Sequence, residues 1–410
     1  MFVAGAFAQT SLSSRDRDLL LVMLHQVRED VGKNYYDPTF HGVDLEGRFR
    51  EAEQHVKTTG SFNDAIGTLS DLLIGLDDSH TVFIPPNRKT RVDYGWHMGM
   101  VGDRPLVLSV TPHSDAEAKG LAPGDRVLML NTYQPGRSNL WQLTYYYRFI
   151  RPQAQQRVSV LKPDGSARTL DIVSRVENKQ ITEIGDLIAE IEEMLDRARD
   201  RGAAVGAGRD VFVWKMSVFG NPDSVDDMIR KARGYKTLVL DLRGNGGGAV
   251  TALRELVSRC FDREVLVASE KRRDKDVREV AKPAKNGFAG TLIVLVDSRS
   301  ASAAEMFARI VQIEKRGTVL GDRTAGAVMT SRMFPHKVGV GAVAFYATSI
   351  TVGDVRMSDG ASLEKAGVEP DEVVLPTAGD LAAGRDPVLA QAIALAGGAI
   401  TPEEAGRLFK

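Results

Sequence analysis

The stretch Asp241-Leu-Arg-Gly-Asn-Gly-Gly-Gly-Ala249 stands between an apolar run that begins at Thr237 and a segment of helical spacing at 249–261. Successive glycines let the backbone turn sharply and direct its N–H groups into a concave nest. Such N–H groups can stabilise the negative charge that develops on a carbonyl oxygen during acyl transfer. The stretch therefore predicts a strand-to-helix turn, with an oxyanion hole as its functional interpretation and a tight turn as its structural one.

The same residues also fit a dinucleotide-binding fingerprint, because Gly244-x-Gly246-x-x-Ala249 has the form G-x-G-x-x-G/A. Glu264 and Glu270 lie about where that motif places an acid for the ribose. The fingerprint normally opens the first strand–helix unit of its domain, whereas here at least one such unit precedes it. A dinucleotide-dependent oxidoreductase is therefore the less favoured alternative.

Strand-like and helix-like segments alternate around the glycine-rich turn. Residues 211–216 and 291–296 are apolar runs of strand length, and each precedes a segment with helical spacing, at 223–234 and 301–314. Alternation of this kind predicts a mostly parallel α/β sheet that carries helices on its faces.

The period of the apolar residues changes along the chain and so divides it into regions. Helical spacing dominates the first 90 residues, and alternation with a period of two dominates the next part, where Pro163-Asp-Gly165 marks a hairpin turn. We expect a helical unit at 10–90, a β-rich module at 91–177, a linker helix at 178–204, the α/β core at 205–380 and a helical tail at 381–410.

A second strand-to-helix turn, Asp297-Ser-Arg-Ser-Ala-Ser302, carries three serines. A serine at a helix N-terminus beside a strand end is exposed and close to the helix dipole, where a nucleophile can work, although the commoner role there is a helix cap. The three serines are equivalent on position alone. A serine nucleophile needs a base, and His80 and His336 are candidates because triads assemble in any chain order.

Composition limits the possible partners and chemistry. The chain has 410 residues, with 53 Lys and Arg against 54 Asp and Glu, which gives a net charge of −1. At ~100–200 residues per domain this length predicts two to four domains. The balanced charge gives no sign of a nucleic-acid partner, and the single Cys260 excludes an internal disulfide or a multi-cysteine metal site. No apolar run reaches the ~18 residues needed to span a bilayer.

The amino terminus matches half of a secretion signal. Ala6-Phe-Ala8 followed by Gln9 has the A-x-A form of a cleavage site, but a basic segment and a longer apolar core are missing. A signal remnant, and hence a periplasmic or secreted protein, and a frayed cytoplasmic terminus are both open interpretations.

Four motifs, in this order, resemble the superfamily of carboxyl-terminal-processing (tail-specific) proteases and tricorn-core proteases. They are Leu76-Asp-Asp-Ser-His-Thr81, the glycine-rich stretch at 241–248, Ser300-Ala-Ser-Ala-Ala-Glu305 with Val319–Gly326 after it, and Leu363–Asp371. The likeness covers about residues 14–395. It implies a ClpP/crotonase-like α/β catalytic core.

The β-rich module resembles a PDZ domain. Gly120-Leu-Ala-Pro-Gly-Asp-Arg-Val-Leu128 is similar to a signature of that domain, and Gly95-Trp-His-Met-Gly-Met100 is similar to its carboxylate-binding loop. A PDZ domain adds a peptide to its sheet edge and binds the terminal carboxylate with backbone N–H groups. The resemblance therefore implies peptide binding at Gly95, Trp96, His97 and Met98.

The superfamily contains two catalytic designs, and this sequence departs from one of them. The tail-specific branch has a lysine 25 residues after its serine, where this chain has Ala327. The tricorn-like branch uses serine, histidine and glutamate with a helper serine beside the histidine. The resemblance thus implies Ser302 as nucleophile, His80 as general base, Glu364 as the acid that orients the imidazole, Ser79 as helper, and oxyanion donors among Gly246, Gly247 and Ala303.

These residues together predict a serine endopeptidase that cleaves proteins or peptides with free, apolar C-termini and needs no metal or organic cofactor. Among them Glu364 has two close rivals, Asp359 and Glu369. A non-catalytic peptide-binding scaffold with the same fold is the main alternative. We expect export from the cytoplasm, and a homo-oligomer is left open.

Overall fold

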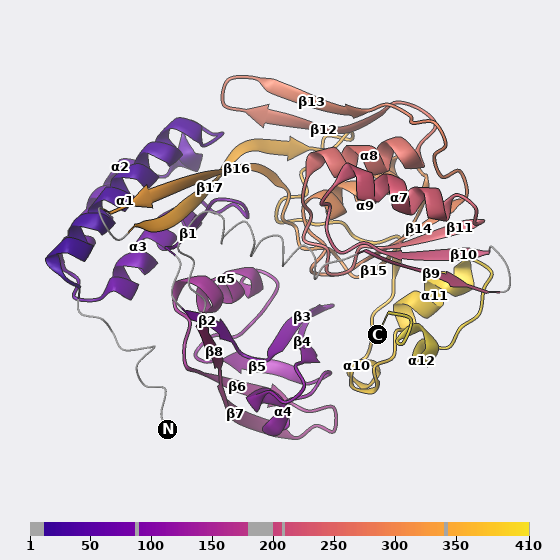
Figure 1. Ribbon diagram of the computed structural model, residues 1–410, viewed down its shortest axis with the longest axis horizontal. Helices are drawn as coiled ribbons and strands as arrows, with labels where there is room; N and C mark the ends of the chain where they lie inside the picture. The colour runs from indigo at the N-terminus through magenta and orange to yellow at the C-terminus, as the bar shows by residue number, and fades with distance from the viewer. Residues whose placement is uncertain (1–11, 87–89, 179–199, 207–209, 340–342, 410) are drawn as a thin grey trace.

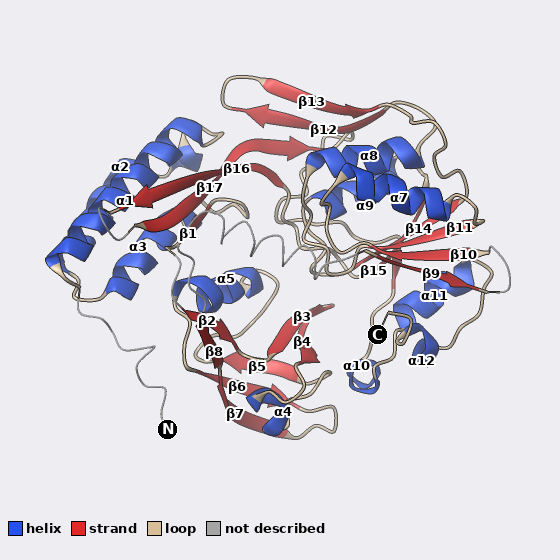
Figure 2. Ribbon diagram, in the orientation of Figure 1, coloured by secondary structure: helices blue, strands red, loops and turns tan. Residues whose placement is uncertain are grey.

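The computed structural model describes residues 12–86, 90–178, 200–206, 210–339 and 343–409. They form a helical unit, an antiparallel module and a core that contains two sheets (Figures 1 and 2). Most of the linker helix expected at 178–204 lies outside the described residues, and Arg201 begins a strand. Ala6-Phe-Ala8 also lies outside them.

The central sheet of the core has six strands in the order β18-β15-β14-β11-β10-β9. Neighbours from β18 to β10 run parallel, and only β9 is antiparallel to its neighbour, which confirms the mostly parallel sheet. Every residue of β11 is buried, as expected for a strand covered on both faces. The strands are β9 (Arg201–Val205), β10 (Val211–Lys215), β11 (Thr237–Asp241), β14 (Thr291–Val296), β15 (Gly317–Gly321) and β18 (Glu372–Val373).

Helices cover both faces of this sheet (Figure 1). On one face α7 (Pro222–Ala232), α8 (Val250–Cys260) and α9 (Ala303–Ile313) bury the largest apolar cluster of the chain. On the other face α11 (Pro387–Leu395) and α12 (Pro402–Ala405) of the tail pack on Val213, Val239 and Leu295. The short α10 (Ala378–Ala383) precedes them.

A second, antiparallel sheet was not expected from the sequence. Its strands are β1 (Val82–Ile84), β12 (Val265–Arg272), β13 (Asp276–Ala281), β16 (Met329–Val338) and β17 (Ala344–Arg356), and β17 pairs with β1, β12 and β16. The strand that follows α8 thus joins this sheet and does not return beside β11. The chain returns beside β11 only with β14, after the β12–β13 hairpin, so this is not the compact strand–helix–strand unit of a dinucleotide fold, and the structure argues against the oxidoreductase interpretation. Glu270, one of its two candidate acids, is buried and paired with Arg272.

The helical unit packs on the β16–β17 hairpin (Figure 1). It consists of α1 (Ser14–Asn34), a short 3₁₀ turn (Phe40–Gly42), α2 (Leu45–Thr58) and α3 (Phe62–Ile74), and the side chains of Ser13, Asp44 and Ser61 cap the three α-helices. After α3 the chain enters β1, which pairs with Ser349, Thr348 and Ala347 of β17. This pairing brings the turn between α3 and β1 to the core.

The module is an insertion whose entry and exit strands pair with each other, β2 (Thr90–Asp93) with β8 (Arg175–Asn178). Its five-stranded antiparallel sheet runs β3-β4-β5-β6-β7, so β3 lies at an edge. The strands are β3 (Trp96–Val101), β4 (Arg104–Val110), β5 (Arg126–Leu130), β6 (Gln155–Leu161) and β7 (Ala167–Val173), with α4 (Asp115–Ala118), α5 (Leu140–Tyr145) and a π-helical turn (Tyr146–Ile150). The hairpin turn expected at 163–165 joins β6 and β7.

No helix in the part of the chain that the structure describes is both long and apolar enough to cross a membrane.

Candidate active site

The two glycine- and serine-containing turns meet because their strands are neighbours. β11 and β14 pair in parallel, so the turns that follow them leave the same edge of the sheet. The N–H of Ala301 donates to the carbonyl of Asn245 at 2.9 Å, which joins the turns. A Cβ atom on Gly247 would lie 2.6 Å from Cβ of Ser302, and Gly247 has a φ of +95°. Only glycine fits this contact, so the glycine-rich turn is shaped to the serine turn.

Ser302 adopts a backbone conformation that is rare for a residue with a side chain. Its φ and ψ are 54° and −118°, immediately before α9. Its N–H donates to the carbonyl of Ala327 at 2.9 Å and to Oε2 of Glu305 at 3.0 Å. Strained residues of this kind persist only when their surroundings fix them, and a sharp strand-to-helix turn is a known way to expose a nucleophilic serine.

The other two serines of this turn have structural hydrogen bonds. Ser298 Oγ donates to the carbonyl of Met100 in the module at 2.7 Å. Ser300 is fully buried, and its hydroxyl donates to the carbonyl of Leu242 at 2.8 Å. These contacts hold the turn in place, and they distinguish Ser298 and Ser300 from Ser302, which the sequence alone did not do.

The turn that carries His80 is organised by the buried carboxylate of Asp78. Asp78 Oδ1 accepts the N–H groups of His80 and Thr81 at 2.9 and 2.7 Å and the hydroxyl of Thr351 at 2.7 Å, and Oδ2 accepts the hydroxyl of Tyr35 at 2.9 Å. Thr351 belongs to β17 and Tyr35 follows α1. One carboxylate therefore joins the His80 turn to the core sheet and to the helical unit.

Ser79 links His80 to Glu364. Ser79 Oγ lies 2.7 Å from Nδ1 of His80 and donates to Oε2 of Glu364 at 2.8 Å, while the N–H of Ser79 donates to Oε1 at 2.8 Å. A hydroxyl has one proton, so with that proton on Glu364 the oxygen of Ser79 accepts from Nδ1–H. This assignment leaves Nε2 of neutral His80 without a proton and able to act as a base.

The Ser79 hydroxyl lies between Glu364 and the imidazole, so Glu364 would orient His80 through Ser79. Oε2 of Glu364 also accepts the N–H of Val328 at 2.8 Å. The two rivals lie elsewhere, since Asp359 pairs with Arg309 and Glu369 is exposed beside Arg323. Val328 follows Ala327, the residue that accepts the Ser302 N–H. Hydrogen bonds and one peptide bond thus connect His80 to the Ser302 backbone.

Burial changes the charge behaviour of both members of this relay. It lowers the pKa of His80, against a smaller opposite effect of Asp78, so the imidazole is neutral at pH 7. It raises the pKa of Glu364 even though Ser79 and Val328 donate to the carboxylate. A neutral histidine is the form that a general base requires.

The candidate oxyanion donors differ in their availability. The N–H of Gly247 donates to Oδ1 of Asn245 at 2.8 Å and is therefore not counted as an oxyanion donor. The role of Gly247 is steric, because its missing side chain leaves room for Ser302. Gly246 is exposed on the turn. Ala303 is the first residue of α9, where backbone N–H groups are not needed by the helix.

His336, the other histidine considered as a base, has a different partner. Its Nε2 lies 2.7 Å from Oδ2 of Asp30, whose same oxygen accepts the hydroxyl of Thr348 at 2.6 Å. His336 therefore joins α1 to the β16–β17 hairpin.

The residues expected to bind a peptide terminus lie at the start of edge strand β3. Gly95 has a φ of +72° and donates its N–H to Asp93, while Trp96 is buried and His97 is exposed. The opposite end of β3 contacts the core, because Met100 accepts the hydroxyl of Ser298.

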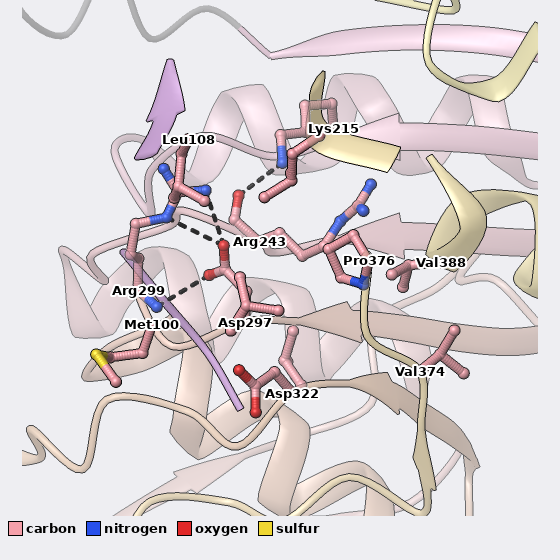
Figure 3. Close-up of a pocket in the computed structure, with 13 residues that line it drawn as sticks. Met100, Leu108, Lys215, Arg243, Asp297, Arg299, Asp322, Val374, Pro376 and Val388 are labelled. Atoms are coloured by element: carbon pink, nitrogen blue, oxygen red, sulfur yellow. Dashed lines mark hydrogen bonds and ion pairs between the residues drawn. The ribbon is translucent and has the colours of Figure 1, made fainter. Parts of the chain in front are cut away.

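A cavity of about 220 Å³ lies where the module, the central sheet and the tail meet (Figure 3). Its charged groups are paired with one another or with neighbours: Arg299 with Asp297, Arg243 with Asp241 and Asp386, and Lys215 with Asp241. Its lining does not include Ser302, His80 or Glu364. The cavity is therefore separate from the proposed catalytic residues.

Three residues with important contacts were not assigned a role from sequence. Asp78, Asn245 and Glu305 are all buried polar residues that accept hydrogen bonds from the turns of the site. For Glu305 a signal existed, because Ser302-x-x-Glu305 has the form of a capping box. Asp78 and Asn245 stand inside quoted motifs, but their partners are remote in sequence.

Comparison with known proteins shows similarity between this chain and peptidases. The model of Peptidase family S41 matches residues 211–374. The chain is 24% identical over 361 residues to carboxyl-terminal-processing peptidase 2, chloroplastic, of Arabidopsis thaliana. That alignment covers 83% of this chain and 66%, just under two thirds, of that protein. It is 25% identical over 395 residues to the carboxyl-terminal-processing protease of Picosynechococcus sp. That alignment covers 91% of this chain and 87% of that protein. Among solved structures, mature CPAF has the same fold, with a TM-score of 0.68 at 15% identity over 89% of this chain and 94% of that one.

Proposed function

Because the chain carries a serine-peptidase domain of family S41 at residues 211–374, we propose that it hydrolyses peptide bonds with Ser302 as the nucleophile and His80 as the general base. The observation that carries this proposal is the continuous connection from His80 through Ser79, Glu364 and Val328 to the strained Ser302 turn. It joins three motifs that are far apart in the sequence.

In the proposed reaction, Nε2 of neutral His80 accepts the proton of Ser302 as Oγ attacks the substrate carbonyl. The charge on the carbonyl oxygen is stabilised by the N–H of Ala303 and by an N–H of the glycine-rich turn, for which Gly246 is our choice. His80 then delivers the proton to the leaving amine, and water releases the acyl group from Ser302. Glu364 stabilises the imidazolium through Ser79.

The test is labelling with a fluorophosphonate probe, followed by peptide mapping. We expect the wild type to be labelled at Ser302, and we expect Ser302→Ala and His80→Ala to remain unlabelled. Ser298→Ala is the matched control, because it removes a hydroxyl from the same turn that is bound to the module and is not proposed to react. Labelling at another serine, or undiminished labelling of His80→Ala, would overturn the assignment.

For substrates, we propose proteins or peptides with free, apolar C-termini that the module binds as an added strand on β3. Support comes from the edge position of β3 and from its contact with the Ser302 turn through Met100 and Ser298. Hydrolysis of paired peptides that differ only in a free or amidated C-terminus tests this. Equal rates for both members would contradict it.

We further propose that the protein acts outside the cytoplasm, as the A-x-A pattern at 6–8 suggests. Cell fractionation of the protein as expressed from its own gene tests this location.

A further inference from the structure

The Glu305 carboxylate lies behind the Ser302 turn and is fully buried. Each of its oxygens accepts two hydrogen bonds. Oε1 accepts the hydroxyl of Thr324 at 2.5 Å and the N–H of Gly326 at 2.8 Å. Oε2 accepts the N–H of Ala327 at 2.9 Å and that of Ser302 at 3.0 Å. One side chain thus holds the Ser302 backbone and the loop at 324–327 together.

All four partners of Glu305 are donors, which makes its protonation state important. An ionised carboxylate accepts at both oxygens, whereas a protonated one carries an O–H that would face an N–H donor or force the Thr324 hydroxyl to turn its own proton away. A buried donor left without an acceptor is destabilising, because it has lost its hydrogen bonds to water and gained none in return. The arrangement around Ser302 is therefore complete only when Glu305 is ionised.

The loop that Glu305 holds also supports the histidine half of the site. Val328, which follows the loop, donates to Glu364, and the carbonyl of Gly326 accepts the N–H of Lys365 at 2.7 Å. The hydroxyl of Thr324 also accepts the N–H of Val368 at 2.6 Å. Displacement of this loop would therefore move Glu364 as well as Ser302.

On the basis of the proposed function, we propose that Glu305 is a positioning residue that, in its ionised form, sets Ser302 and the Glu364 relay in the geometry that the reaction needs. It acts through backbone contacts and does not itself touch substrate.

Burial raises the pKa of Glu305 to about 7, because the four hydrogen bonds offset the loss of solvent only in part. Charged groups on the surrounding elements are engaged with other partners: Asp322 with Arg137, Arg323 with Glu369, Glu364 with Ser79, Lys365 with Asp77, Arg243 with Asp241, Glu255 with Arg259, Arg254 with Glu279, Glu270 with Arg272, and Arg309 on α9 itself with Asp359. Glu305 therefore titrates near neutral pH, without a direct cationic partner.

This titration gives a signature distinct from that of His80. Falling pH protonates Glu305 as it passes about 7, and activity is lost there. His80 must also be neutral, but its pKa lies below the ordinary 6.5, so its loss of activity comes at lower pH. The acid limb of the pH–rate profile is the range in which the rate falls as pH falls. An acid limb near pH 7 in the wild type is thus assigned to Glu305.

The experiment measures the rate of fluorophosphonate labelling of Ser302 in the full chain from pH 5 to 9. For Glu305→Gln we expect labelling about tenfold slower at pH 8, since a displaced nucleophile reacts more slowly. We also expect the acid limb to move from about 7 to below 6.5, where His80 titrates. Glu314→Gln, at the residue that follows the same helix, is the control and should match the wild type at every pH.

A second variant keeps the test decisive if Glu305→Gln does not fold. Thr324→Val removes one hydrogen bond that lowers the pKa of Glu305, so its acid limb should move to higher pH, while Thr324→Ser should keep the limb of the wild type. An acid limb that neither Glu305→Gln nor Thr324→Val moves, in proteins that label at Ser302, would overturn the proposal and leave the protease function standing. Absence of labelling at Ser302 in the wild type would instead contradict the proposed function.

Discussion

The serine and the histidine of the proposed site are supported in different ways. Ser302 lies on a turn between a buried parallel strand and a helix, and main-chain hydrogen bonds to Ala327 and from Ala301 to Asn245 fix it within the core. His80 comes from a separate helical unit. It reaches the core through the three-residue strand β1 and through the buried carboxylate of Asp78.

This difference separates what local sequence specifies from what tertiary contacts specify. The Ser302 turn follows from strand order and glycine placement, so it forms wherever the central sheet forms. The position of His80 depends on polar contacts between residues more than 40 positions apart, such as Tyr35 with Asp78. We therefore expect changes on the serine side to abolish the reaction and changes in the support of His80 to weaken it by degrees.

The largest expected effect comes from removing either half. His80→Ala and Ser302→Ala should each lower hydrolysis of an unfolded protein substrate by at least about 10³-fold, because neither group works alone. The double variant should be no slower than the slower single variant, since groups that act as a unit are not additive. Multiplied losses in the double variant would show that the two halves act independently.

A change within the glycine-rich turn should be the next largest. Gly247→Ala places a Cβ at 2.6 Å from Cβ of Ser302 and at a φ of +95°, so the turn must move. We expect hydrolysis to fall about 10²-fold, comparable to the loss of an oxyanion donor.

Gly246→Ala is the matched control for that change. A Cβ on Gly246 meets nothing within 4 Å, and the substitution keeps the N–H that we propose as an oxyanion donor. It should retain at least about one third of the wild-type rate. Equal losses for the two variants would contradict the steric role of Gly247.

The sequence predicted more of the serine half than of the histidine half. The parallel strands, the helices after them and the motifs around Gly247 and Ser302 are local patterns, and the structure has them at the expected places. The second sheet was missed because β1 and β12 pair with β17, which lies far along the chain from both, and no local signal reports such pairing. The roles of His80 and Glu364 and a hydrogen bond from Ser79 to Glu364 were implied by resemblance, whereas the contact of Ser79 with Nδ1 of His80 comes from the structure.

The relay itself should have an intermediate effect. Ser79→Ala removes the hydroxyl that joins Nδ1 of His80 to Glu364, so the imidazole loses both its orientation and the support of its charged form. We expect the turnover rate to fall roughly 10²-fold, at the lower end of what a general base contributes, with little change in KM. Ser79→Thr keeps the hydroxyl and should recover part of the rate. An unchanged rate in Ser79→Ala would remove Glu364 from the proposed mechanism.

The smallest effect is expected from the network that supports His80. Asp78→Asn replaces a carboxylate that accepts four hydrogen bonds by an amide whose NH₂ faces donors, at a cost of about 2 kcal/mol in unfolding free energy. Because His80 stays in the turn before β1 but shifts, hydrolysis should fall about tenfold. Tyr35→Phe removes one of the four donors and leaves the carboxylate, so it should cost about 1 kcal/mol and change the rate less than twofold. Urea unfolding and hydrolysis assays on the two variants measure both quantities. If Asp78→Asn destabilised the protein and left hydrolysis at the wild-type rate, the position of His80 would not depend on this network, and the contrast between the two halves of the site would fail.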